Sequence, residues 1–307
     1  MTKTIRAAAL LATIGAALLA LSVGPAAAAS QTRIASCDDG AQFSALQALT
    51  SSTVTDARTE KETESISGST EIGQKTPGKP TAGVIDVYFH VVTTTSGTGA
   101  VSAATVDDQI GVLNMTFGGF YGGANTGFSF RLAGTETTAN NAWYGLETFA
   151  DEIAMKSALK QGDSTDLNIY SGSGGGYLGW AYYPSITNSQ NYGVLDGVVL
   201  HYGSLPGGYI ANYDLGYTAT HEVGHWLGLP HTFSQGCIGH GDYSDDTAAQ
   251  ASPTSGCPIG RDSCPKAGLD PIHNYRDYSY DACYSQFTPN QTARMQKQFA
   301  HWRLKRA

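Results

Sequence analysis

The sequence predicts a fold of the α/β (α+β) class that begins near Gly83 and ends in an irregular half. Strand-like and helix-like patterns alternate from there to about residue 205, as they do in an α/β layer. After His231 the residues Gly, Asp, Ser, Pro and Cys dominate to about Gln286, so little regular structure is expected there. From Ser30 to about Thr81 the chain is polar and has too few apolar residues to build a packed core.

Five short segments have the composition and period of strands. The first is nearly continuous in apolar and β-branched residues (VIDVYFHVV), as a strand buried on both faces should be. The predicted strands are Val84–Val92, Phe128–Leu132, Leu167–Tyr170, Leu178–Tyr183 and Asp196–His201.

Capping signals predict three helices between and after these strands. Thr105 is expected to open the first helix, with Asp108 at the capping-box position. Asp151–Lys160 is the second helix. The last helix starts after Thr288, and Gln291 completes its capping box.

The first 29 residues have the three parts of a secretory signal peptide. Lys3 and Arg6 give a basic start, Ala7–Val23 is apolar, and Ala27–Ala29 supplies the small residues that a signal peptidase needs. The apolar run is shorter than the roughly 20 residues of a membrane-spanning helix, and no other segment is apolar enough to cross a bilayer. We therefore expect a secreted, extracellular protein, a monomer that makes no membrane contact.

Charge and cysteines narrow the class of protein further. The formal net charge of −8 argues against a nucleic-acid partner, because such proteins usually carry a basic patch. Export makes disulfides possible. Four of the five cysteines, Cys237, Cys257, Cys264 and Cys283, lie close together in the irregular half, and Cys37 stands alone. Four cysteines allow three pairings, and their spacing does not choose among them.

One segment carries the chemistry, and it runs His221-Glu222-Val223-Gly224-His225-Trp226-Leu227-Gly228-Leu229-Pro230-His231. Residues four apart share a face of a helix, so His221 and His225 can bind one metal ion. Gly228 lets the helix end and the chain turn, and His231 can then return as a third ligand. Three protein ligands leave the fourth zinc position open to water, which is typical of a catalytic site.

The same segment predicts a mechanism. Glu222 lies beside the metal ligands without being one, so it can act as the general base on a water that zinc activates for attack on a peptide carbonyl. A pattern with both Gly and the third His arises by chance in on the order of 10⁻⁵ of chains with this composition. A purely structural role for these histidines is therefore a poor explanation.

The eleven-residue segment resembles the metzincin zinc signature, and further blocks resemble the pappalysin family of metzincins, in its secreted bacterial or fungal type. The blocks are VIDVYFHVV, LNIYSGSGGGYLGWAYYP, HEVGHWLGLPHTF, GCPIGRDSCP and DPIHNYRDYSYDACYSQFTPNQTARM, and they span roughly residues 83–303. The resemblance implies that residues 83–307 form a metzincin-like zinc peptidase catalytic domain. It implies a twisted mixed five-stranded sheet with backing helices and an active-site helix, above an irregular lower subdomain stapled by the disulfides Cys237–Cys264 and Cys257–Cys283.

The chain departs from the family at one position. The resemblance implies a methionine in a tight turn below the zinc, and Arg276 stands there instead. Because a buried unpaired charge is costly, Arg276 must find partners or turn outward. Tyr278 matches the family tyrosine that lies near the zinc and steadies the transition state.

Two further sites are hypotheses. Residues 30–82 are expected to form a pro-segment and linker that keeps the enzyme inactive before export, rather than a plain N-terminal tail. The Cys37 thiolate could block the open zinc position as a zymogen switch, as could Asp38; the alternatives are a stray thiol or an intermolecular disulfide. Asp242, Asp245 and Asp246 offer oxygen ligands that suit Ca²⁺, although a solvated acidic loop without calcium explains them too.

The leading hypothesis is a secreted zinc-dependent endopeptidase (a zinc metalloendopeptidase, with Zn²⁺ and a possible Ca²⁺ as cofactors) that acts on protein or peptide substrates. Two alternatives belong to other classes. One is a catalytically weakened zinc-binding homologue that acts as a protein-binding module, which Arg276 alone supports. The other is a disulfide-stapled adhesion domain without metal.

Overall fold

The computed structural model describes residues 82–187, 192–266 and 268–304. A five-stranded sheet has the order β2-β1-β3-β5-β4. Neighbouring strands are parallel except for β4, which is antiparallel to β5. The strands are β1 Val84–Thr93, β2 Ser129–Ala139, β3 Leu167–Gly172, β4 Gly179–Ala181 and β5 Val198–His201. The mixed α/β sheet implied by the family resemblance is therefore confirmed.

The second strand is longer than predicted. Its register with β1 runs to Thr93 opposite Ala139 and shifts once, at Val87/Tyr88. Residues after Leu132 alternate between half-buried and exposed, because β2 is an edge strand. Such a polar, threonine-rich half lacks the apolar alternation on which the sequence prediction relied.

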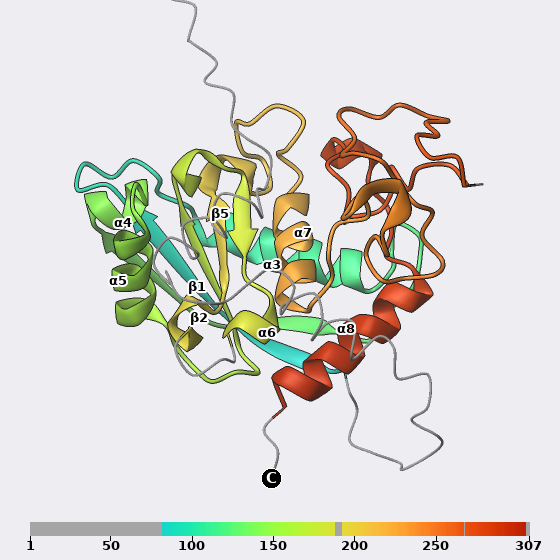
Figure 1. The fold of residues 1–307 in the computed structure, drawn as a ribbon. Helices are drawn as coiled ribbons and strands as arrows, with labels where there is room; N and C mark the ends of the chain where they lie inside the picture. The colour runs from blue at the N-terminus through green and yellow to red at the C-terminus, as the bar shows by residue number, and fades with distance from the viewer. Residues whose placement is uncertain (1–81, 188–191, 267, 305–307) are drawn as a thin grey trace, which may run out of the picture. The chain divides into compact units, whose positions relative to one another are not determined.

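Hydrophobic residues cover both faces of the sheet. Alternate residues of β1 (Ile85, Val87 and Phe89) pack in one cluster with helices α3 (Ala103–Phe117), α7 (Tyr217–Trp226) and α8 (Pro289–Trp302). A second cluster joins the other face to α5 (Phe149–Leu159) through Met155 and Tyr170. Short helices α4 (Asn141–Gly145) and α6 (Pro184–Thr187) complete this layer. Figure 1 shows α4 and α5 on one side of the sheet and α7 and α8 on the other.

Two helix starts differ from the sequence prediction. α3 begins at Ala103, where Ser102 is the N-cap and accepts a hydrogen bond from the Thr105 amide at 3.0 Å, so Thr105 lies inside the helix and does not open it. Residues 103 and 104 are alanines, which favour the helix and extend it by one turn towards the N-terminus. α5 is capped by Thr148, whose capping box uses Asp151 at the third position. The predicted cap of α8, Thr288 with Gln291, is confirmed.

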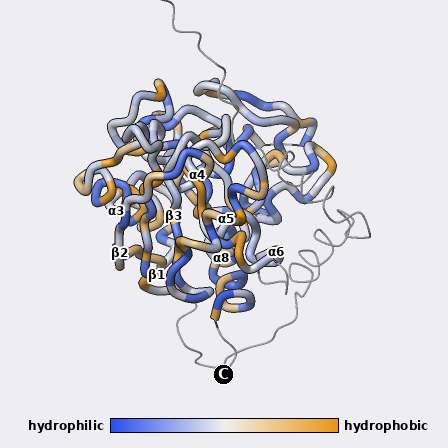
Figure 2. The backbone as a smooth tube through the Cα atoms, turned by 90° about the vertical axis from the view of Figure 1, so that its left-hand side faces the viewer, coloured by the Kyte–Doolittle hydropathy of each residue, from blue (hydrophilic) through white to orange (hydrophobic). Residues whose placement is uncertain are grey.

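From His231 to Phe287 the described chain contains only two short 3-10 turns, at Gly236–Ile238 and Asp281–Cys283. Two disulfides hold this lower subdomain, Cys237–Cys264 and Cys257–Cys283, which is the pairing that the resemblance implied. No helix of the described residues is long and apolar enough to cross a bilayer. Figure 2 likewise shows hydrophobic residues in short stretches between hydrophilic ones.

Candidate metal centre and active site

Helix α7 carries the first part of the site, and all ten of its residues are buried. The chain leaves the helix through Gly228, whose φ of +89° favours glycine. A Cβ at Gly228 would lie 2.7 Å from the Gln298 side chain, so α8 also requires a glycine there. This turn returns the chain over the helix and brings His231 back towards His221 and His225.

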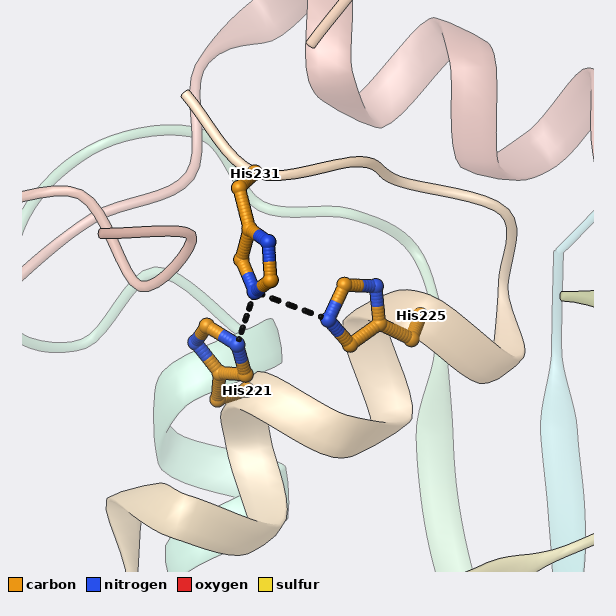
Figure 3. A group of neighbouring side chains, drawn as sticks. All are labelled: His221, His225 and His231. Carbon is orange, nitrogen blue, oxygen red and sulfur yellow. Dashed lines mark hydrogen bonds between the residues drawn. The ribbon is translucent and has the colours of Figure 1, made fainter. Parts of the chain in front are cut away.

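Three imidazoles meet at one point (Figure 3). Nε2 of His231 lies 3.0 Å from Nε2 of His221 and 3.1 Å from Nε2 of His225. All three side chains are buried, and among the described residues they form one of two groups whose donor atoms could hold a metal ion. The other group is Cys257, His273 and Cys283, and its sulfur atoms are already joined in a disulfide.

The donor set fits a zinc ion. A tetrahedral ion with Zn–N bonds of about 2.0–2.1 Å holds its nitrogen ligands roughly 3.3 Å apart, close to the separations seen here. Nδ1 of His221 lies 2.7 Å from the Tyr275 carbonyl and Nδ1 of His225 lies 2.9 Å from the Leu229 carbonyl. Each Nδ1 therefore donates its proton to a carbonyl, which directs the Nε2 lone pair to the metal position.

Electrostatics keep these ligands neutral. Burial lowers the pKa of both His221 and His225 well below the ordinary value, and the positive charge of Arg276 lowers it further. Neutral imidazole is the form that binds a metal.

Glu222 is fully buried on the helix turn between the two histidines. A Cβ at Gly179 of β4 would lie 3.0 Å from Cγ of Glu222, so the sheet edge approaches this carboxylate closely only because position 179 is glycine. The active-site helix and the antiparallel edge strand therefore enclose the side chain that the sequence assigned as general base.

Arg276 is buried and has found partners, which decides between the two alternatives that the sequence left open. Its Nε donates to the Pro230 carbonyl at 3.2 Å, and Nη1 donates to the His221 carbonyl. The backbone of the same turn accepts a hydrogen bond from the Thr232 amide at 3.2 Å. The turn that carries Arg276 is thus hydrogen-bonded to both ends of the segment His221–His231, which is called the metal segment below.

Two more buried arginines donate to carbonyls of this segment. Arg294 Nε lies 3.0 Å from the Gly228 carbonyl, and Arg303 Nη2 lies 2.8 Å from the Trp226 carbonyl. Arg303 also forms a buried ion pair with Asp196, which lowers the pKa of that carboxyl against the opposing effect of burial. The sequence analysis missed both arginines, because nothing in the sequence separates a buried arginine from one on the surface of an amphipathic helix.

A pocket opens beside His221. Its lining residues come from the sheet edge, the loop before α7, α7 itself and the lower subdomain: Leu178, Tyr213, Tyr217, Thr218, His221, Tyr278, Asp281 and Tyr284. Asp281 is 1% exposed, and its Oδ2 accepts from the Leu215 amide at 2.9 Å. Its Oδ1 has no hydrogen-bond partner among the described residues. Burial raises the pKa of Asp281 to about 7.

Tyr278 is half-buried and also lines this pocket. Its ring centroid lies 4.8 Å from that of His231 and 5.6 Å from that of His221. The ring of Phe233 stacks on that of His231 with 4.6 Å between their centroids, which helps to hold the third ligand in place.

The remaining predicted sites lie elsewhere. Cys37 and the predicted pro-segment are outside the described residues, apart from Ala82. Asp242 is buried and accepts from the Ser244 amide and from Gln291, and burial raises its pKa to about 6. Asp246 accepts from the Thr288 hydroxyl at 2.7 Å, while Asp245 is exposed. Asp242 and Asp246 thus accept hydrogen bonds from protein groups, and calcium binding stays a prediction.

Comparisons with known proteins place the chain in a family. The family model described as Pregnancy-associated plasma protein-A matches residues 174–300. An extracellular metalloprotease of Sordaria macrospora is 49% identical over 225 residues, which cover 71% of this chain and 75% of that protein. One from Pyricularia oryzae is 50% identical, with 71% and 76% covered. The chain belongs to the pappalysin family of metzincin metallopeptidases.

Solved structures agree with this assignment. Mirolysin in complex with compound 9 is 32% identical with a TM-score of 0.63, and the match covers 71% of this chain and 91% of that chain. Mature mirolysin of Tannerella forsythia in complex with a cleaved peptide is 29% identical with a TM-score of 0.58, covering 73% and 93%. The metallopeptidase described here is thus a zinc metalloendopeptidase with a metzincin-like fold.

Proposed function

We propose that this peptidase is a secreted endopeptidase in which His221, His225 and His231 hold zinc and Glu222 is the general base. The convergence of three buried Nε2 atoms, with 3.0 and 3.1 Å between them, carries the proposal. Bound zinc would supply a Lewis acid that polarises the scissile carbonyl and lowers the pKa of a water molecule towards about 7. Relatives named extracellular metalloproteases support secretion of this chain.

The chain's own residues would divide the remaining work. Glu222 takes a proton from the attacking water and passes it to the leaving amine, and its buried position beside Gly179 keeps bulk solvent from competing for that proton. Tyr278, whose ring lies against two of the histidines, can donate its hydroxyl proton in a hydrogen bond to the oxygen on which negative charge develops.

The pocket beside His221 would select the substrate side chain. Asp281 presents a carboxylate oxygen without a protein partner in a buried, tyrosine-lined space. A buried carboxylate is most stable when a cation pairs with it. We therefore assign to this pocket a lysine or arginine side chain next to the bond that is cut.

A precursor form is also part of the proposal. Promirolysin of Tannerella forsythia, studied as a mutant, matches 81% of this chain at 27% identity and a TM-score of 0.67, which supports a zymogen. Processing would remove residues 1–82, so N-terminal sequencing of the active secreted protein is expected to give a start near Gly83. A start before Cys37 would remove the pro-segment from the proposal.

The replacement Glu222→Gln tests the mechanism. The variant should lose at least about 10³-fold in kcat on a peptide substrate, because the base is gone, and should keep one zinc per chain in elemental analysis. Retained cleavage would remove the assigned role of Glu222. Wild-type protein that binds zinc but cuts no peptide would instead support the protein-binding module.

A further inference from the structure

A buried carboxylate on helix α5 holds the edge strand β4 through two aromatic side chains, one in the strand and one directly after it. Oε1 of Glu152 accepts a hydrogen bond from Nε1 of Trp180 at 2.9 Å, and Oε2 accepts one from the hydroxyl of Tyr182 at 3.0 Å. Glu152 is 2% exposed, and both aromatic side chains are buried. Each oxygen of the carboxylate therefore fixes one of the two rings.

Lys156 lies one helical turn further along α5 and neutralises this carboxylate. Its Nζ lies 2.7 Å from Oε1 of Glu152 and donates to the Leu195 carbonyl at 2.7 Å. The lysine has no exposed surface. A buried ion pair adds little net stability, because the desolvation of two charges offsets their attraction. The pair is therefore better explained by what the carboxylate holds in place than by its own contribution to the free energy of folding.

The opposite face of the same strand meets the proposed general base. Successive side chains of a strand point to opposite faces of its sheet. Trp180 and Tyr182 pack in the cluster with α5, whereas Ala181 packs against the cluster with α7. A Cβ at Gly179 would lie 3.0 Å from Cγ of Glu222 in the metal segment. β4 is thus fixed to α5 on one face and approaches Glu222 with the other.

We propose that Glu152 is a positioning residue: by holding Trp180 and Tyr182, it sets the position of β4 against Glu222. β4 has only three residues and pairs with one neighbouring strand, β5, so the sheet alone fixes it weakly. Misplacement of a catalytic group by about 1 Å can cost on the order of 10²-fold in rate. Loss of the carboxylate should therefore slow catalysis, although Glu152 acts only through β4. This inference rests on the role of Glu222 proposed above.

Peptide cleavage by the secreted enzyme tests this role. Rates are expressed per zinc-loaded molecule, so that an unfolded fraction does not lower kcat. Tyr182→Phe removes one hydroxyl and leaves the ring and the ion pair in place, and should lower kcat about 3- to 10-fold with KM within about threefold of wild type. Glu152→Gln puts an amide donor where an oxygen accepted a hydrogen bond, and should lower kcat about 10- to 100-fold.

A double variant separates positioning from charge balance. Glu152→Gln alone leaves the Lys156 cation buried without its partner, which is destabilising. Adding Lys156→Met removes that cation, so resistance to urea should recover. The value of kcat should stay within about threefold of that of Glu152→Gln, because the second acceptor oxygen is still missing. Recovery of wild-type kcat in the double variant would mean that the pair only balances charge, and would overturn the inference.

The matched control is Glu136→Gln on β2, the opposite edge of the same sheet, which three strands separate from β4. Glu136 also bonds a buried side chain, His90, at 2.7 Å. Its replacement should leave kcat within about threefold of wild type. Unchanged kcat in Tyr182→Phe and Glu152→Gln would overturn the positioning role, as would an equal loss in the control. Cleavage retained by Glu222→Gln would instead refute the proposed function.

Discussion

The replacement Asp281→Asn isolates the charge in the pocket beside the metal centre. The amide keeps an oxygen that can accept the hydrogen bond from the Leu215 amide, which the structure places at 2.9 Å, so the loop stays anchored while the negative charge is lost. A lysine or arginine about 4 Å from this buried carboxylate would gain roughly 4 kcal/mol at an effective dielectric constant of about 20. Desolvation of the cation offsets about half of this gain. The net gain is about 2 kcal/mol, which corresponds to a preference of roughly 30-fold in kcat/KM.

The assay compares kcat/KM for two peptides that differ only in a lysine or a leucine next to the cut bond. At pH 8 the ratio should fall about 30-fold in the asparagine variant. Because the pKa of Asp281 is raised to about 7, the wild-type preference for lysine should also fall as the pH drops from 8 to 6 and the carboxyl takes up a proton. An unchanged ratio in the variant, or a wild-type ratio that is flat between pH 6 and 8, would refute the assignment of the pocket.

The raised pKa of Asp281 also predicts how the free energy of unfolding depends on pH. The pKa of Asp281 is about 7 in the folded chain against a reference of 3.8, so the protonated folded form is favoured, and stability falls as the pH rises from about 4 to about 7. The difference of about three units corresponds to about 4 kcal/mol. Asparagine does not ionise, so Asp281→Asn should not lose this stability as the pH rises. Its free energy of unfolding relative to that of wild type should therefore increase between pH 4 and pH 7. Urea unfolding at pH 4 and pH 8, with Glu222→Gln in both proteins to prevent self-cleavage, measures it.

Three further predictions concern residues around the metal centre. Tyr278→Phe should lower kcat about 10- to 100-fold with little change in KM, because the hydroxyl acts on developing charge; an unchanged kcat would leave the tyrosine a packing role. His231→Ala should lose stoichiometric zinc in elemental analysis, since only two ligands remain on α7, and full zinc content would exclude it as a ligand. Arg303→Met leaves Asp196 buried without its main partner and should cost about 3–5 kcal/mol in urea unfolding. The matched control, Arg131→Met, breaks an exposed pair and should cost under about 1 kcal/mol.

The sequence by itself determined the elements whose signals are local. The four-residue spacing of His221 and His225 predicts a shared helix face, and Gly228 predicts the turn that returns His231; both are geometric consequences of neighbouring residues. The cap of α8 at Thr288 was correct for the same reason. The start of α3 was wrong by one turn, because Ser102 and Thr105 carry similar capping signals and only the formed helix shows which one accepts the amide proton.

Tertiary structure decided what depends on distant partners. Cysteine spacing left three pairings open, and the closed lower subdomain holds one of them. The sequence left open whether Arg276 is buried and gave no signal for Asp281. In the structure Arg276 is buried against the segment His221–His231, across 55 residues to His221, and Asp281 is buried against the loop before α7, across 66 residues to Leu215. The energy of a buried charge depends on the groups that surround it. Those groups are brought together only when the sheet, α7 and the lower subdomain pack against one another.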